Sequence, residues 1–217
     1  MGARAGWVLV AAMAAGASYP LSWLLPLEPT LAIAWKGAGV VLLAVYAALA
    51  GRGTDGRLLT AVMAFGAAGD VLLETSGLAV GAVAFFAGHL TAVWLYLRNR
   101  RAELVAPDII PALTLAIGTP LLAWALPADR AGAPQAAVYA LGLGAMAATA
   151  WLGRFPRRLT ALGAVMFVAS DELIFLRTGR PMEHALWMGL AVWGLYFAGQ
   201  ALIVIGVTRA RTAPPAA

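Results

Sequence analysis

Residues 58–74 read LLTAVMAFGAAGDVLLE, and residues 159–176 read LTALGAVMFVASDELIFL. Each stretch is an apolar run that carries an aspartate in its second half, Asp70 in the first and Asp171 in the second. A charge at the centre of a membrane helix costs about 3 kcal/mol on insertion scales, so an aspartate in such a run is by default a candidate functional residue. The two stretches therefore predict membrane-spanning helices that carry a polar site.

The rest of the chain is similarly apolar. Of its 217 residues, 62% are hydrophobic and 12% are charged, whereas soluble domains contain roughly 25% charged residues. Apolar runs of this length predict an all-α membrane protein with eight transmembrane helices in a single polytopic domain over 1–217. The expected spans are 5–25, 31–50, 58–75, 78–97, 109–126, 135–152, 159–177 and 185–207, followed by a tail over 208–217. The first run is too long for a typical signal peptide, so we expect it to be retained.

The arginines predict the orientation. Eleven of them fall on the side of the two termini, and only Arg130, Arg177 and Arg180 fall on the other side. The positive-inside rule then places both termini in the cytoplasm. The chain has one lysine and many alanines, which is typical of GC-rich bacterial genes, so we expect a multi-pass protein of the bacterial inner membrane.

A weak internal repeat relates the two halves. FGAAGDVLLE (65–74) resembles FVASDELIFL (167–176), and FFAGH (85–89) resembles YFAGQ (196–200). Four helices per half would make two parallel repeats, a known membrane design. The repeat would place the two aspartates at equivalent depths.

Other polar residues lie in or near the same spans. Glu74 follows Asp70 by one helical turn, His89 lies in the middle of the next span, and Lys36 lies near the outer end of the second. Purely structural roles remain open: one aspartate could pair with Lys36, His89 could be packed, and Glu74 and Glu172 could reach a wet helix end. Further hydrogen-bonding groups come from Tyr139, Ser170, Tyr196 and Gln200.

Several kinds of site are not expected. A catalytic zinc ion takes three protein ligands, but the chain has two histidines, of which His184 falls in a loop, and no cysteine. The sequence contains no Gly-x-Ser-x-Gly motif and no Gly-rich phosphate loop before a lysine. The Gly-x-Gly-Asp pattern of intramembrane aspartyl proteases fails because Asp70 follows Ala67-Ala68-Gly69. We therefore expect no metal and no cofactor, and the loop arginines do not indicate a nucleic-acid partner.

At these residues the chain resembles the YhhN family of lysoplasmalogenases, which are multi-pass membrane hydrolases. The chain departs from the family pattern at Gly37, where a proline is frequent, and at Ala92, where a tyrosine is frequent. The matching pieces are Lys36, Gly69-Asp70 with Leu72-Leu73, Phe86, His89, Tyr139, Met146, Phe167, Ser170-Asp171 and the run from Tyr196 to Ile203.

The resemblance implies hydrolysis of the vinyl-ether bond of lysoplasmalogens to a fatty aldehyde and a glycerophospho-headgroup. This reaction needs an acid that is still protonated near neutral pH and a carboxylate that stabilises the cation. A carboxyl group in an apolar environment holds its proton more tightly, and a second carboxylate strengthens the effect. We therefore expect Asp70 and Asp171 to share one proton as an acid/base pair. The expected helpers are His89 and Glu74 for water or proton relay, Lys36 and Tyr139 for the polar head, and Ser170, Tyr196 and Gln200 around the substrate.

Three other functions remain open. Midplane carboxylates and parallel repeats also suit a small-solute or proton-coupled transporter. A non-catalytic lipid-binding protein would explain the glycines and aromatic residues but would leave both aspartates without a purpose. A hydrolase of another lysolipid would share the lysophospholipid substrate class and the bilayer as partners.

Overall fold

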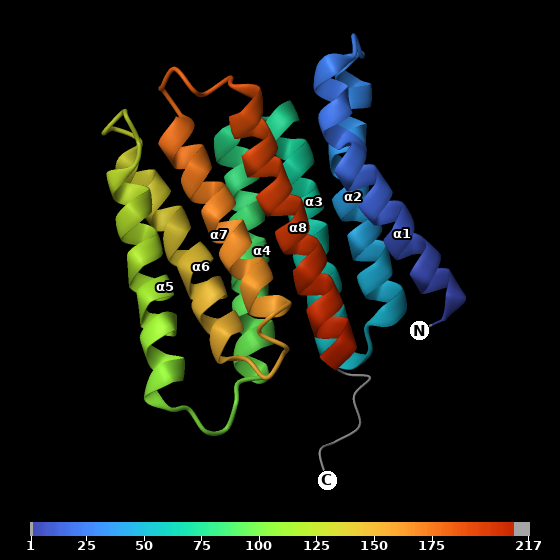
Figure 1. The fold of residues 1–217 in the computed structure, drawn as a ribbon, viewed down its shortest axis with the longest axis vertical. Helices are drawn as coiled ribbons and strands as arrows, with labels where there is room; N and C mark the ends of the chain where they lie inside the picture. Colours follow the sequence, from blue (N-terminus) through green and yellow to red (C-terminus); the bar gives the residue numbers. More distant parts are fainter. Residues whose placement is uncertain (1, 211–217) are drawn as a thin grey trace. The chain divides into compact units, whose positions relative to one another are not determined.

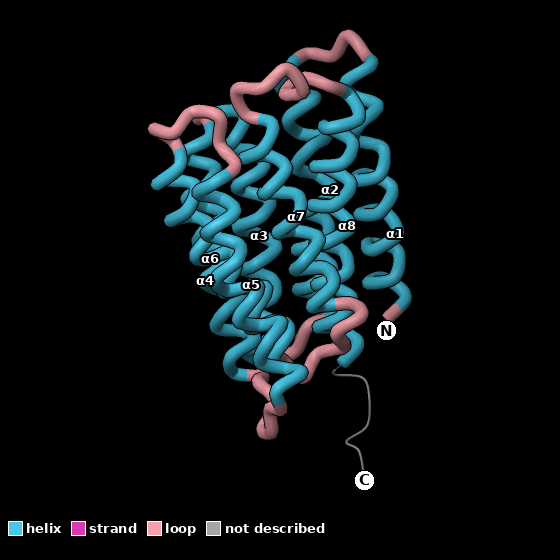
Figure 2. The backbone as a smooth tube through the Cα atoms, turned by 60° about the vertical axis from the view of Figure 1, so that its left-hand side comes forward, coloured by secondary structure: helices cyan, strands magenta, loops and turns pink. Residues whose placement is uncertain are grey.

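The structure is a computed structural model that describes residues 2–210. Within this range the chain forms eight α-helices, one short 3₁₀ helix and no β-strand (Figures 1 and 2). The elements are α1 (Ala3–Ser18), η1 (Tyr19–Leu24), α2 (Pro29–Ala50), α3 (Gly53–Thr75), α4 (Leu78–Arg98), α5 (Ala106–Ala125), α6 (Ala133–Leu152), α7 (Thr160–Arg177) and α8 (Leu186–Ala210). The predicted all-α membrane architecture is confirmed.

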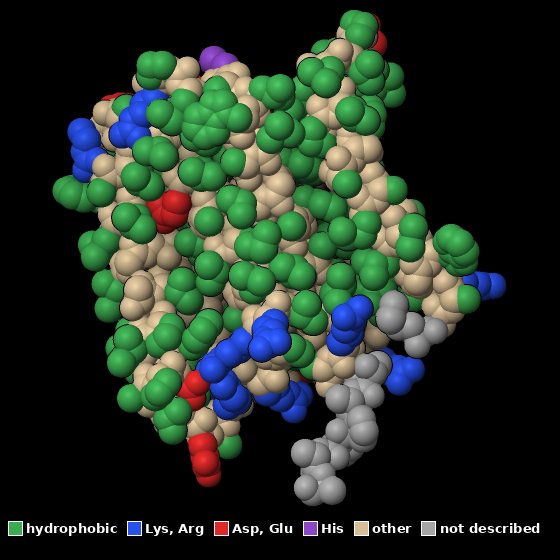
Figure 3. Space-filling view, in the orientation of Figure 1, with side chains coloured by type: hydrophobic (Ala, Val, Ile, Leu, Met, Phe, Trp, Pro, Cys, Tyr) green, Lys and Arg blue, Asp and Glu red, His purple; other side chains and the backbone are tan. Residues whose placement is uncertain are grey.

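Seven of the helices in the described range are long and apolar enough to cross a membrane. The remaining helix, α7, has 18 residues and carries Asp171, Glu172 and Arg177. Large apolar side chains on the outside support a hydrocarbon environment: Trp7 is 74% exposed, Val83 70% and Ile110 64%. An apolar surface of this extent, visible in Figure 3, is unusual for a soluble monomer.

Two helix boundaries differ from the expected spans. The expected first span over 5–25 is not one continuous α-helix, because the α-helical part stops at Ser18 and a 3₁₀ turn follows. Pro20 lies in the first positions of that turn, where its ring and missing N–H prevent further α-helical hydrogen bonding. The third helix begins at Gly53 instead of 58, because its first turn is polar and carries Asp55, a charge that the helix N-terminus favours.

The chain divides into two compact units, Met1–Leu95 with Val204–Ala217, and Tyr96–Ile203. Each unit is described by itself. In the first unit, α2 packs against both α1 and α3. The Trp35 indole N–H donates to Ser18 at 3.1 Å, and the Tyr46 hydroxyl lies 3.2 Å from that of Thr208. These contacts fasten α2 to α1 and to the last turns of α8.

Glycine allows α3 and α4 to approach closely in the first unit. A Cβ atom on Gly69 would lie 2.7 Å from the Phe85 ring, and one on Gly81 would lie 2.9 Å from the backbone of Leu73. At Gly81 a side chain would require a helix to move, and at Gly69 it would require the Phe85 ring to shift. The glycine directly before Asp70 therefore has a packing reason.

The second unit contains α5, α6 and α7, with α6 in contact with both of the others. A Cβ atom on Gly163 of α7 would lie 2.6 Å from the carbonyl oxygen of Gly199 in α8, and the reverse contact is 2.7 Å. Small residues at such crossings let two backbones touch, which is the usual way membrane helices pack. These two glycines set the spacing between α7 and α8.

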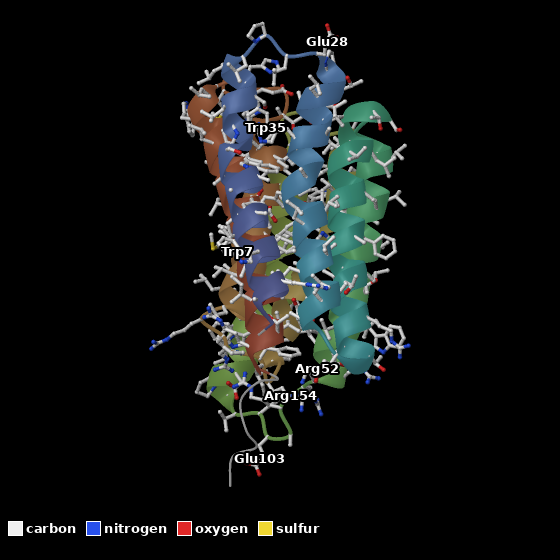
Figure 4. All side chains as sticks on the ribbon, turned by 90° about the vertical axis from the view of Figure 1, so that its right-hand side faces the viewer. Trp7, Glu28, Trp35, Arg52, Glu103 and Arg154 are labelled. Atoms are coloured by element: carbon white, nitrogen blue, oxygen red, sulfur yellow. The ribbon has the colours of Figure 1, made fainter. Side chains whose placement is uncertain are left out.

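The arginine-rich loops of the second unit meet at one end of it. The loop after α4 pairs with the loop after α6 through an antiparallel bridge between Arg100 and Gly153. At the start of α5, Asp108 forms ion pairs with Arg157 and with Arg101. Figure 3 shows basic side chains gathered near the α6–α7 connection, and Figure 4 labels Arg154 and Glu103 there.

Candidate functional site

The residues predicted for the site fall into two groups, one in each compact unit. The first group comes from the first half of the sequence and the second group from the second half. The first unit holds Lys36, Asp70, Glu74 and His89, and the second holds Tyr139, Ser170, Asp171, Tyr196 and Gln200.

In the first unit, Asp70 on α3 and His89 on α4 are both buried, each with 2% of its surface exposed. Each follows directly after a glycine at the α3–α4 crossing. Gly69 contacts the Phe85 ring, and a Cβ atom on Gly88 would lie 3.2 Å from the Cβ atom of Phe65. Close helix packing therefore keeps solvent away from both polar side chains.

Lys36 and Glu74 form an ion pair in the same unit. The Lys36 ammonium donates to Oε1 of Glu74 at 2.6 Å and joins α2 to the last turn of α3. The Lys36 side chain is 13% exposed and that of Glu74 is 39% exposed. The pair therefore lies at the edge of the buried region, one turn beyond Asp70.

In the second unit, Asp171 of α7 is 7% exposed and accepts a hydrogen bond from the Tyr139 hydroxyl of α6 at 2.7 Å. The Tyr139 ring also packs edge-on against Phe175, with centroids 6.1 Å apart. The sequence assigned Tyr139 to the polar head of the substrate. In the structure the Tyr139 O–H donates to Asp171, so the ring lies where it can orient that carboxyl group.

Aromatic residues of α8 lie against the same stretch of α7. Phe167 packs edge-on against Tyr196 at 5.1 Å, and Trp193 stacks on Phe197 at 5.8 Å. The Ser170 hydroxyl donates to the carbonyl oxygen of Val192 at 2.9 Å. The Ser170 hydroxyl therefore links α7 to α8. The neighbouring aromatic rings surround this contact with apolar surface.

Two of the buried polar groups that have no hydrogen-bond partner lie on α7 and α8 of the second unit, close in sequence to Asp171 and Tyr196. One is Oε1 of Gln200, a residue that is 2% exposed. The other is the Glu172 carboxyl group, both of whose oxygens are buried. Unpartnered buried polar atoms are rare and require an explanation, such as a bound molecule or a catalytic role.

The burial of the Glu172 carboxyl group was not predicted from the sequence. A wet helix end was one expectation for it, but its two oxygens have no exposed surface. The available signal was its position directly after Asp171, inside an apolar run. Among the described residues, no group of three or more His, Cys, Asp and Glu side chains could hold a metal ion.

Comparisons with known proteins agree on one family. The model of the YhhN family matches residues 31–207, which covers α2 to the last turns of α8. A lysoplasmalogenase of Mycobacterium bovis is 32% identical over 197 residues, covering 83% of this chain and 72% of that protein. The lysoplasmalogenase TMEM86B of Sus scrofa is 30% identical over 208 residues, covering 92% of this chain and 85% of its own. No solved structure matches the chain.

Proposed function

This chain belongs to the YhhN family, and on that premise we propose that it is a membrane-embedded lysoplasmalogenase. Its substrate is a lysophospholipid with a vinyl-ether chain. The products are a fatty aldehyde and a glycerophospho-headgroup. The relatives that carry this name are bacterial and mammalian, so the proposal does not depend on one lineage.

The reaction begins with a proton transfer to the β-carbon of the vinyl ether, which breaks the C=C double bond and leaves an oxocarbenium ion. Water then adds to the cationic carbon and loses one proton, which gives a hemiacetal. The hemiacetal collapses when its hydroxyl loses a proton and the glycerol oxygen gains one. The proton supplied in the first step is thus returned by water, and the protein needs one general acid and one general base.

We assign these two roles to Asp70 and Asp171. Both side chains are buried, and an ionised carboxylate shielded from water stabilises a nearby cation strongly. His89, which is buried like Asp70, relays a proton or orients water. Glu74, one helical turn after Asp70 on α3, assists His89 in this role. Lys36 holds the phosphate, Tyr139 orients the Asp171 carboxyl group, and Ser170, Tyr196 and Gln200 position the reacting end of the lipid.

The hydrogen bond from Tyr139 to Asp171 is the observation that carries the mechanism. A lone carboxyl group in an apolar helix could be an accident of packing, but here α6 supplies a dedicated donor at 2.7 Å. A hydrogen bond of this kind restrains the rotamer of the carboxyl group. Preorganisation of this kind is what a proton-transfer site requires.

Aldehyde release by the purified full-length protein tests the proposal. The assay uses a panel of lysolipids with vinyl-ether, saturated-ether and ester chains, and mass spectrometry identifies the products. We expect turnover of the vinyl-ether lipid alone, and a loss of about 10²- to 10⁴-fold in kcat for Asp70→Asn and for Asp171→Asn. Near-wild-type turnover in both variants would remove the aspartates from the mechanism. Cleavage of the ester lipid instead would reassign the substrate.

A further inference from the structure

We infer that the Lys36–Glu74 ion pair is a recognition site for a zwitterionic headgroup with a primary ammonium, and so for phosphoethanolamine over phosphocholine. This inference rests on the proposed function, because it names the headgroup of the same substrate. The ammonium of Lys36 is complementary to a phosphate and the carboxylate of Glu74 is complementary to an ammonium. A phosphoethanolamine group carries both charges, so it can exchange partners with the pair without leaving a charge unpaired.

The position of the pair along the helices suits a headgroup. Glu74 is the second-to-last residue of α3, and Lys36 lies seven residues after the start of α2. Figure 4 shows the start of α2, marked by Glu28, extending beyond the end of α3 and the start of α4. We use the word step for this difference in height between the start of α2 and the end of α3, and the ion pair lies near it, because Glu74 is at the end of α3. Its partial exposure, 13% for Lys36 and 39% for Glu74, leaves it accessible from that step.

The spacing between Glu74 and Asp70 fits the length of the substrate. The two residues are one turn apart on α3, which is about 6 Å along the helix axis. In a lysoplasmalogen, five single bonds separate the phosphorus from the vinyl-ether oxygen, which is also about 6 Å when extended at ordinary bond lengths. A lipid whose phosphate binds Lys36 therefore presents its vinyl-ether bond at the level of Asp70.

Glu74 explains the preference for ethanolamine. A carboxylate can accept hydrogen bonds from a primary ammonium, whereas the quaternary ammonium of choline has no N–H to donate. Proteins that bind quaternary ammonium groups use aromatic cages instead. A hydrogen bond between charged groups changes affinity by about tenfold to a hundredfold. We expect a preference within that range.

Binding of saturated 1-alkyl lysolipids to the full-length protein in detergent tests the inference. These lipids lack the vinyl-ether bond, so their binding does not require turnover. We expect wild-type protein to bind the phosphoethanolamine lipid at least about tenfold more tightly than the phosphocholine lipid. Glu74→Gln should bring the two affinities together, and Lys36→Gln should weaken both. Equal affinities in the wild type would overturn the inference.

A charge-reversed double variant, Lys36→Glu with Glu74→Lys, distinguishes recognition from a purely structural ion pair. It restores an ion pair, so its melting temperature should exceed that of either single substitution. It also exchanges the positions of the two charges, so the headgroup preference should not return. Recovery of the wild-type preference in this variant would overturn the inference. If the predicted preference is found but no aldehyde is released from the vinyl-ether lipid, the headgroup site stands and the proposed hydrolysis fails.

Discussion

Substitution of Tyr139 by phenylalanine tests the role of its partly buried hydrogen bond to Asp171. The change removes one oxygen atom and keeps the ring that packs against Phe175 at 6.1 Å. It therefore removes the 2.7 Å donor and leaves the surrounding shape intact. Hydrogen bonds to charged groups contribute about 1.5–3 kcal/mol, and about 1.4 kcal/mol corresponds to a factor of ten in rate. We expect kcat for aldehyde release to fall by about tenfold to a hundredfold.

Tyr96 supplies a matched control. It is as deeply buried as a tyrosine can be, at 0% exposed, yet its hydroxyl has no hydrogen-bond partner. Tyr96→Phe removes the same atom from the same unit without breaking a bond, and replacing an unpaired polar group by an apolar one is close to neutral. We expect it to retain wild-type kcat and melting temperature.

The steady-state assay separates three outcomes for Tyr139→Phe. A fall in kcat with an unchanged KM supports a positioning role for Asp171. A rise in KM with an unchanged kcat refutes that role and returns Tyr139 to the polar head, as the sequence alone predicted. Equal losses in Tyr139→Phe and Tyr96→Phe would show that the unit tolerates no such change, and this would also refute the specific role of the bond.

Three other perturbations have clear expectations. Gly163→Ala places a Cβ atom 2.6 Å from the carbonyl of Gly199, so overpacking should destabilise the protein by about 1–3 kcal/mol in thermal unfolding; Gly118→Ala has open space around it and should not lower the melting temperature. Asp108→Asn removes the partner of Arg157 and Arg101, so the melting temperature should fall, and by less at high salt, because salt screens the wild-type ion pairs; a loss that does not depend on salt would contradict this. Dialysis against EDTA should leave aldehyde release unchanged, and a loss restored by a divalent metal would refute the metal-free mechanism.

Most of the helices could be predicted because a bilayer permits little else. A backbone in hydrocarbon must satisfy its own hydrogen bonds, so an apolar run of sufficient length predicts a helix. This hydropathy signal stops at polar residues, so it did not predict the polar first turn of α3 around Asp55. Pro20 lies where the α-helical part of the first span ends. The prediction of that span followed the length of the apolar run and did not account for this proline.

The pairing of side chains was the harder part of the site. Tyr139 and Asp171 are 32 residues apart, and Lys36 and Glu74 are 38 apart, so each contact depends on how two helices rotate against each other. Hydropathy reports the length of a helix and gives little information on its rotation. For the same reason the sequence did not distinguish Glu172, whose oxygens are buried, from a glutamate that reaches water.

The polarity of α7 also bears on how the protein is made. A nascent segment with Asp171 carries a residue that the translocon penalises by about 2.5–3.5 kcal/mol near a helix centre, and Glu172 adds a second carboxyl group next to it. The following helix, α8, is longer and more apolar, and it contacts α7 through Gly163 and Gly199. Synthesis that stops after α7 should therefore leave this segment outside the lipid. Its insertion would then wait for α8 to leave the ribosome, so Asp171 would enter the bilayer together with α8.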